Sequence, residues 1–231
     1  LVQADAVFAH YDEQIRLGLQ VAANTVHFNW MARGEPFLNS VVLNEHKQLF
    51  EALCFRAHIR KLNVKFKISS IFPKDTPLVS LNNVMNQPDV RTYYSLYSLD
   101  NSFRKRWLPK AHPPMEVLDW IGENHRTAEK PYDMALHWAF IAGENDSQAQ
   151  VTAIVDAVEE RQIDTKFNLV RYNPYSPAQG AESSDEVLLD RLRLIRPVIN
   201  TGTTRMIARV GFDVRASCGM FLHPSEHSKD E

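Results

Sequence analysis

Strand-like segments alternate with helix-like segments along most of the chain, and this order restricts the folds it can adopt. Apolar residues at helical spacing predict helices over residues 6–23, 42–59, 115–125, 147–161 and 184–196. Short apolar runs predict strands over residues 26–31, 65–72, 92–97, 135–142 and 166–172, with a final extended segment over 204–210. This alternation is typical of an α/β fold in which mostly parallel strands form an open or closed β/α barrel with helices packed outside it.

The composition is that of a globular protein with a single core. The chain has 231 residues, of which 44% are hydrophobic and 23% are charged, and it contains no linker-like segment. We expect one domain over residues 1–222 and a polar tail over residues 223–231. Because the first residue is Leu1 rather than methionine, we interpret the sequence as a piece of a longer protein.

Cysteine content and hydropathy favour a cytoplasmic protein without a membrane span. Two cysteines argue against a disulfide scaffold, and no apolar run approaches the roughly 20 residues needed to cross a bilayer. The net charge of -2 does not by itself indicate a nucleic-acid binder, although a few clustered cations can still form a basic face.

Small polar residues stand at the carboxyl ends of the predicted strands. Gly34 and Glu35 follow the first strand and Asn173 ends a later one, while the two strands between carry Ser69, Ser70, Ser95, Tyr97 and Ser98. Because the carboxyl ends of parallel strands meet at one edge, where β/α folds bind ligands, we expect a ligand site there in which Glu35 binds an amine. The alternative is structural, since Glu35 can be a solvated turn residue and each polar side chain taken singly is more often structural.

Cys218 is the candidate nucleophile. It lies in the run Arg-Ala-Ser-Cys-Gly-Met at residues 215–220, where small neighbours leave room for another molecule and Arg215 can favour the thiolate. A single cysteine is more often buried and inert, and this alternative stays open. Cys54 lies among apolar residues of a predicted helix and is expected to belong to the core.

Residues 101–107 combine three cations with two aromatic side chains, a mixture that contacts phosphates and stacks on bases. The alternative is the start of a solvated helix in which Phe103 and Trp107, four residues apart, pack inward. Arg104 is the residue of this segment that we retain as a candidate substrate contact. The nine histidines show no spacing that predicts a metal site.

Several short motifs occur in order along the chain. They are Gly-Glu-Pro at residues 34–36, Ser-Leu-Tyr-Ser at 95–98, Phe-Arg at 103–104, Asn-Asp-Ser at 145–147, Tyr-Asn-Pro at 172–174 and Ala-Ser-Cys-Gly at 216–219. In this order they resemble the radical S-adenosylmethionine (SAM) RNA methyltransferases that modify C2 or C8 of adenine, the RlmN and Cfr group. The resemblance extends to about Phe221 and implies a partial (β/α) barrel of the radical SAM type whose first strand is missing.

The resemblance implies a role for individual residues. SAM would be bound by Gly34, Glu35, Ser69, Ser95, Tyr97 and Asn173. Cys218 would carry the methyl group. In that family a 4Fe-4S cluster cleaves a second SAM to a 5′-deoxyadenosyl radical, which activates the methylated cysteine toward the adenine ring.

The chain departs from the family at three points. The C-x3-C-x2-C run that binds the cluster is not in the sequence, and the resemblance puts it upstream of Leu1, together with a resolving cysteine and an N-terminal RNA-binding domain. Tyr97 stands where the family usually has histidine, and His137 where it usually has glutamate. We therefore expect these 231 residues alone to be inactive.

Three functions stay open. The first is the methyltransferase core of an enzyme that modifies adenine in ribosomal or transfer RNA and takes electrons from a donor such as flavodoxin. The second is a divergent radical SAM enzyme with another substrate, which Tyr97 and His137 suggest. The third is a relative without a cluster that serves as an RNA-binding or interaction module.

Overall fold

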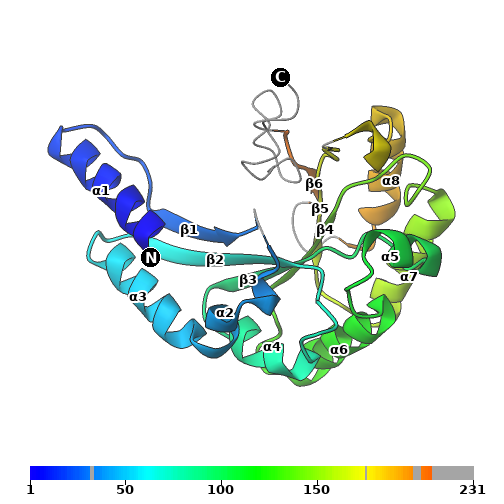
Figure 1. The fold of residues 1–231 in the computed structure, drawn as a ribbon, viewed down its shortest axis with the longest axis horizontal. Helices are drawn as coiled ribbons and strands as arrows, with labels where there is room; N and C mark the ends of the chain where they lie inside the picture. Colours follow the sequence, from blue (N-terminus) through cyan, green and yellow to red (C-terminus); the bar gives the residue numbers. More distant parts are fainter. Residues whose placement is uncertain (32–33, 175, 200–203, 210–231) are drawn as a thin grey trace.

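Six parallel strands form one sheet that curls into a half-barrel (Figure 1). The computed structural model describes residues 1–31, 34–174, 176–199 and 204–209. In the sheet the strands follow their order along the chain: β1 (Thr25–Trp30), β2 (Asn63–Ser70), β3 (Val90–Tyr94), β4 (Met134–Trp138), β5 (Lys166–Leu169) and β6 (Arg205–Met206). This confirms the predicted partial barrel of mostly parallel strands.

Helices cover the convex side of the sheet (Figure 1). Each lies between two consecutive strands or flanks the sheet: α1 (Val2–Arg16), α2 (Ser40–Asn44), α3 (His46–His58), α4 (Leu78–Met85), α5 (Asn101–Trp107), α6 (Pro114–Thr127), α7 (Gln148–Glu160) and α8 (Asp185–Ile195), with the short 3-10 helices η1 (Pro36–Leu38) and η2 (Pro177–Gln179). No helix among these described residues is long and apolar enough to span a bilayer.

Several predicted boundaries are wrong. The strands expected over 135–142 and 166–172 end at Trp138 and Leu169. The helix expected over residues 6–23 ends at Arg16, because Gly18 takes a left-handed backbone conformation (φ +71°) that ends helices. The helix expected over 42–59 is two helices, α2 and α3, which meet at Glu45. The strand expected over 92–97 ends at Tyr94, and Tyr97 lies in a following loop with φ +59°.

The strands alternate between a buried and an open face. In β2, Val64, Phe66 and Ile68 are buried under the helices, and the ring of Phe66 stacks on Phe50 of α3 with centroids 4.2 Å apart. The residues between them, such as Lys65, point to the concave side of the half-barrel. Burying one such aromatic or aliphatic side chain stabilises the fold by roughly 1.5–3 kcal/mol. The core therefore lies between the sheet and the helices, and polar residues occupy the concave face.

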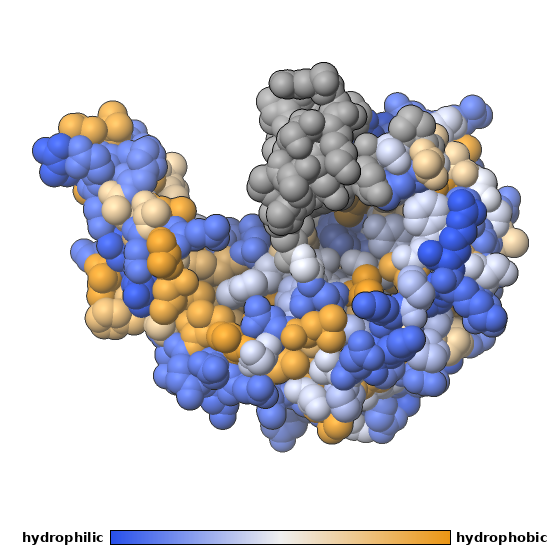
Figure 2. All heavy atoms as spheres, in the orientation of Figure 1, coloured by the Kyte–Doolittle hydropathy of each residue, from blue (hydrophilic) through white to orange (hydrophobic). Residues whose placement is uncertain are grey.

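Helix α1 lies beside the first strand and is attached by apolar packing and by ion pairs. It buries Phe8, and its Asp5 and Asp12 accept hydrogen bonds from Arg56 of α3 (2.5 Å) and from Arg60, which follows α3 (2.6 Å). Ala4 and Tyr11 pack partly against the core, whereas Val7 and Ile15 are exposed. Figure 2 shows a mostly hydrophilic surface on this helix, with hydrophobic residues at its outer end.

Candidate functional site

Polar side chains from three neighbouring strands meet on the concave face, near the carboxyl ends of the strands. The hydroxyl of Ser69, in β2, lies 3.3 Å from the hydroxyl of Ser95, which follows β3. It also lies 3.0 Å from Nε2 of His137, in β4. We refer to Ser69, Ser95 and His137 as the strand-end cluster. Its assembly agrees with the expectation that polar residues at neighbouring strand ends lie together.

His137 is neutral in this cluster. Burial lowers the pKa of its imidazole to about 4, and the ring packs edge-on against Tyr93 with centroids 5.8 Å apart. A neutral imidazole has one nitrogen that donates and one that accepts a hydrogen bond. The cluster therefore offers hydroxyl and imidazole groups without a net charge, which suits a ligand with amino, carboxylate or hydroxyl groups.

Two of the predicted hydroxyls do not face the cluster. Ser70 is buried on the opposite face of β2, where its hydroxyl accepts a hydrogen bond from the backbone N–H of Phe72 (2.8 Å). Ser98 is fully buried, and its hydroxyl accepts from the N–H of Asp100 (3.0 Å). The alternation of the strand explains Ser70, since consecutive residues point to opposite faces.

Glu35 joins the end of β1 to the end of β2. One carboxylate oxygen accepts from the N–H of Phe37 (3.1 Å) and caps η1, and the other accepts from the N–H of Ile71 (3.1 Å). Burial raises the pKa of Glu35, and its hydrogen bonds partly offset this effect. Gly34 beside it has φ +74°, a conformation that favours glycine. The Ser70 side chain also hydrogen-bonds to this carboxylate. Glu35 thus stabilises the turn through three hydrogen bonds, and its two oxygens keep one lone pair for another donor.

Tyr97 is held by its backbone and by an aromatic stack. Its carbonyl accepts a hydrogen bond from Asn145 (3.1 Å), and its ring stacks on Phe103 with centroids 6.3 Å apart. Phe103 is buried and stacks in turn on Trp107 (5.9 Å). This confirms the inward packing of the two aromatic side chains of α5.

Arg104 is buried below the same loop. Its guanidinium donates to the carbonyls of Leu96 (2.8 Å), Ser98 (3.3 Å) and His112 (2.9 Å). Burial lowers the pKa of Arg104, and neighbouring Tyr94 opposes that shift. Its contacts hold the loop after β3 in place, while its role toward a substrate stays a prediction.

Asn145 is a residue whose role the sequence motif did not reveal. It is buried, donates to the carbonyls of Tyr97 and Ala139 (both 3.1 Å) and accepts from the N–H of Ile141 (2.7 Å). It thereby ties the loop after β4 to the loop after β3. The only sequence signal was the Asn-Asp-Ser motif, which gave no hint of this partner 48 positions away.

Two further predicted site residues are Asn173 and Cys218. Asn173 is buried in the loop after β5, where its amide donates to the carbonyl of Arg171 (3.3 Å). Cys218 and the tail over residues 223–231 lie outside the described residues. The described residues bring Ser69 and Ser95 together, and hold Glu35 after β1 and Tyr97 after β3, on either side of β2.

The described part of the chain does not fit an iron–sulfur cluster. It contains no group of three His, Cys, Asp or Glu side chains close enough to hold a metal ion. Cys54 packs against the core from α3, and burial raises the pKa of its thiol. A thiol of this kind is a poor metal ligand.

Comparison with known proteins agrees with the motifs. No protein-family model matches the chain. Over 220 residues, or 93% of the chain, the sequence is 24% identical to the dual-specificity RNA methyltransferase RlmN of Alkalilimnicola ehrlichii. The chain spans 56% of the length of that relative.

Solved structures share the half-barrel. A radical SAM methyltransferase from Sphaerobacter thermophilus matches with a TM-score of 0.64 and 19% identity, over 94% of this chain and 60% of that one. A domain of a pyruvate-formate lyase-activating enzyme from Bacteroides vulgatus matches with a TM-score of 0.54 and 12% identity, over 80% of this chain and all (100%) of that domain. The resemblance to the radical SAM RNA methyltransferase family, predicted from the ordered motifs, is thus confirmed by sequence along most of the chain and by fold.

Proposed function

We propose that the chain is the core of a radical SAM methyltransferase that modifies an adenine of ribosomal or transfer RNA at C2 or C8 through an S-methylcysteine. The observation that carries the proposal is the strand-end cluster at the carboxyl edge of a parallel half-barrel, because β/α folds bind their ligands at this edge. The similarity to an RNA methyltransferase along 93% of the chain supports the choice of RNA as substrate.

The residues near the strand ends would bind SAM. The hydroxyls of Ser69 and Ser95 would bind polar groups of the cofactor, and neutral His137 would complete their hydrogen bonds. Glu35 would accept from the amino group with the lone pair that its bonds to Phe37, Ile71 and Ser70 leave. Gly34, Tyr97 and Asn173 would line the same ligand.

SAM supplies the methyl group and, when cleaved by a reduced iron–sulfur cluster, a radical that can act on an unactivated aromatic carbon. Cys218 would carry the methyl group, and Arg104 would contact the RNA. The 4Fe-4S cluster, an electron donor such as flavodoxin, a cytoplasmic location and a single domain over residues 1–222 are parts of the same proposal.

Binding of SAM tests the proposal. In calorimetry on the whole chain, the double change Ser69→Ala and Ser95→Ala should weaken binding about tenfold, since each lost neutral hydrogen bond costs about 0.5–1.5 kcal/mol. Ser80→Ala, on the exposed face of α4, is the matched control and should leave binding unchanged. Equal affinity in the double variant and the wild type would contradict the cofactor site.

A divergent enzyme is the second candidate, because Ser69 bonds to a histidine where the family usually has glutamate. Mass spectrometry of RNA incubated with the longer parent protein, loaded with its cluster, separates the two candidates. Methylated adenine supports the first. Cleavage of SAM without methylated RNA, in the presence of both RNA classes, supports the second.

A further inference from the structure

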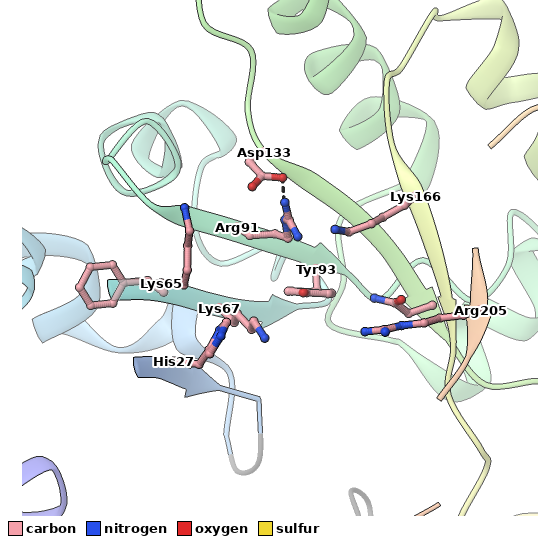
Figure 3. A pocket seen from close by; sticks show the side chains of 10 residues that line it. His27, Lys65, Lys67, Arg91, Tyr93, Asp133, Lys166 and Arg205 are labelled. Atoms are coloured by element: carbon pink, nitrogen blue, oxygen red, sulfur yellow. Dashed lines mark hydrogen bonds and ion pairs between the residues drawn. The ribbon is translucent and has the colours of Figure 1, made fainter. Parts of the chain in front are cut away.

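Positively charged side chains from four strands, together with His27 of β1, line a pocket of about 210 Å³ on the concave face of the sheet (Figure 3). The pocket lies toward the amino ends of the strands, below the strand-end cluster. We call it the basic pocket and define it by its cationic and imidazole side chains: His27, Lys65, Lys67, Arg91, Lys166 and Arg205. Neither the SAM site nor the proposed methyl transfer uses these residues.

The strand register brings these cations together. Lys67 in β2 is the direct partner of Arg91 in β3. Lys166 in β5 pairs with Ala135 of β4, which also pairs with Tyr93. Arg91 lies two residues before Tyr93 on the same face of β3, so Arg91 and Lys166 are diagonal neighbours across β4. Figure 3 shows the side chains of Arg91 and Lys166 extending toward each other. Like charges on directly opposed strand positions are destabilising, so the arrangement requires an explanation.

Carboxylates neutralise only part of this charge. Lys65 pairs with Asp89 (2.5 Å), and Arg91 pairs with Asp133 (2.6 Å). Lys67, Lys166 and Arg205 have no carboxylate within 4.0 Å among the residues that the structure describes. The pocket therefore keeps three cations without an acidic partner in the described part of the chain.

The cations disturb one another. Burial lowers the pKa of Lys67, and the charges of Arg91 and Arg205 lower it further. Burial and the charge of Arg91 act on Lys166 in the same direction. On a solvated sheet face that carried both signs of charge, neighbouring cations would not lower the pKa of one another in this way. A pocket with a positive electrostatic potential concentrates anions.

We propose that the basic pocket binds the phosphate groups of a small ligand that carries two or more of them, such as a nucleoside diphosphate or triphosphate. Arginine and lysine are the side chains that bind phosphate in proteins, through paired N–H donors and as point charges respectively. The pocket is smaller than the roughly 300–1,000 Å³ of sites that enclose a whole drug-sized molecule, so it fits the phosphate part of the ligand.

The site is distinct from the strand-end cluster. Lys67 precedes Ser69 by two residues on the same face of β2, which separates their Cα atoms by roughly 6–7 Å along the strand. A phosphate on Lys67 and Lys166 therefore occupies the layer of side chains below Ser69. The inference stands independently of the proposed methyltransferase activity.

Calorimetric titration of the whole chain with inorganic tripolyphosphate tests the proposal. The wild type should bind the probe. The double change Lys67→Met and Lys166→Met should lower the affinity at least about tenfold, because it removes two charge-assisted contacts. The matched double change Lys47→Met and Lys110→Met removes two exposed cations outside the pocket and should leave the affinity unchanged.

Two further measurements test whether the double variant remains folded and whether SAM binds to the same site. Without ligand, the melting temperature of the Lys67→Met and Lys166→Met variant should equal or exceed that of the wild type, because the variant loses repulsion between cations. Saturating SAM should not displace tripolyphosphate.

Four results would overturn the proposal: no binding by the wild type, equal losses in the two double variants, displacement by SAM, or lysine-dependent binding of a short oligoadenylate in place of tripolyphosphate. The last result would assign the cations to RNA. Displacement by SAM would assign them to the cofactor site, and would leave the proposed methyltransferase activity standing.

Discussion

Ser69 and His137 are hydrogen-bonded across an intervening strand. Ser69 belongs to β2 and His137 to β4, and their side chains meet at 3.0 Å over the concave side of β3. In a flat sheet two such strands are roughly 9–10 Å apart, so the contact uses both the length of the imidazole side chain and the curl of the half-barrel. A change that flattened the sheet would separate the two side chains.

The burial of His137 predicts a pH-dependent stability. The pKa of His137 falls from 6.5 to about 4 in the folded protein. Between these two pH values the imidazole is protonated in the unfolded chain and neutral in the folded one. The contribution of His137 to the free energy of unfolding is therefore full above pH 6.5 and is lost as the pH falls toward 4. At pH 5 the loss should be roughly 2 kcal/mol relative to pH 7.

Urea unfolding at pH 7 and pH 5 measures this contribution. His137→Gln keeps a polar side chain but cannot titrate, so the variant should lose less stability than the wild type between the two pH values. All other ionisable groups are the same in the two proteins, so their contributions cancel in the comparison. Parallel stability curves for the two proteins would contradict the low pKa of His137.

The side chain of Asn145 should contribute strongly to the free energy of unfolding. Asn145→Ala removes three hydrogen bonds between buried groups, and we expect a loss of roughly 2–4 kcal/mol in the free energy of unfolding. Asn83→Ala, at an exposed position of α4, is the control and should stay within about 0.5 kcal/mol of the wild type. Equal unfolding midpoints for the two variants would mean that solvent replaces the contacts of Asn145.

Two arginines of α5 should behave differently. Arg104→Met removes donors to three carbonyls and should destabilise the fold by roughly 2–4 kcal/mol in urea unfolding. Arg106 is largely exposed and pairs with Glu144, so Arg106→Met should cost about 1 kcal/mol or less. If Arg104→Met instead unfolds like the wild type and loses RNA affinity, Arg104 is a substrate contact rather than a structural one.

The two cysteines provide a matched test of the methyl carrier. In the longer parent protein, loaded with its cluster, Cys218→Ala should abolish methylated RNA while cleavage of SAM to 5′-deoxyadenosine stays detectable by chromatography. Cys54→Ala should leave product formation intact, because burial raises the pKa of this thiol and keeps it protonated. Methylation at the wild-type rate by Cys218→Ala protein would remove Cys218 from the mechanism.

The strands could be predicted because their pattern is local. Alternation in the run from Val64 to Ser69 marks a buried and an open face without knowledge of any partner. Helix α4 was not predicted, since its two asparagines and two valines favour helix weakly. It forms because Leu81, Val84 and Met85 are buried against the sheet.

The parts of the site that could not be predicted depend on distant residues. Asn145 donates a hydrogen bond to the carbonyl of Tyr97, and no sequence pattern near either residue predicts this contact. The basic pocket was missed for the same reason, because Lys67, Lys166 and Arg205 are single cations in separate strands. Only the register of the sheet makes them neighbours.

The agreement between strand order and chain order affects how the protein is made. From β2 onward, each strand pairs with the strand that directly precedes it along the chain, so its partner has already been synthesised when it leaves the ribosome. Sheets with swapped strand order must wait for later segments, and their unpaired edges are open to aggregation meanwhile. Here the half-barrel can grow by one strand and one helix at a time, from β1 toward β6.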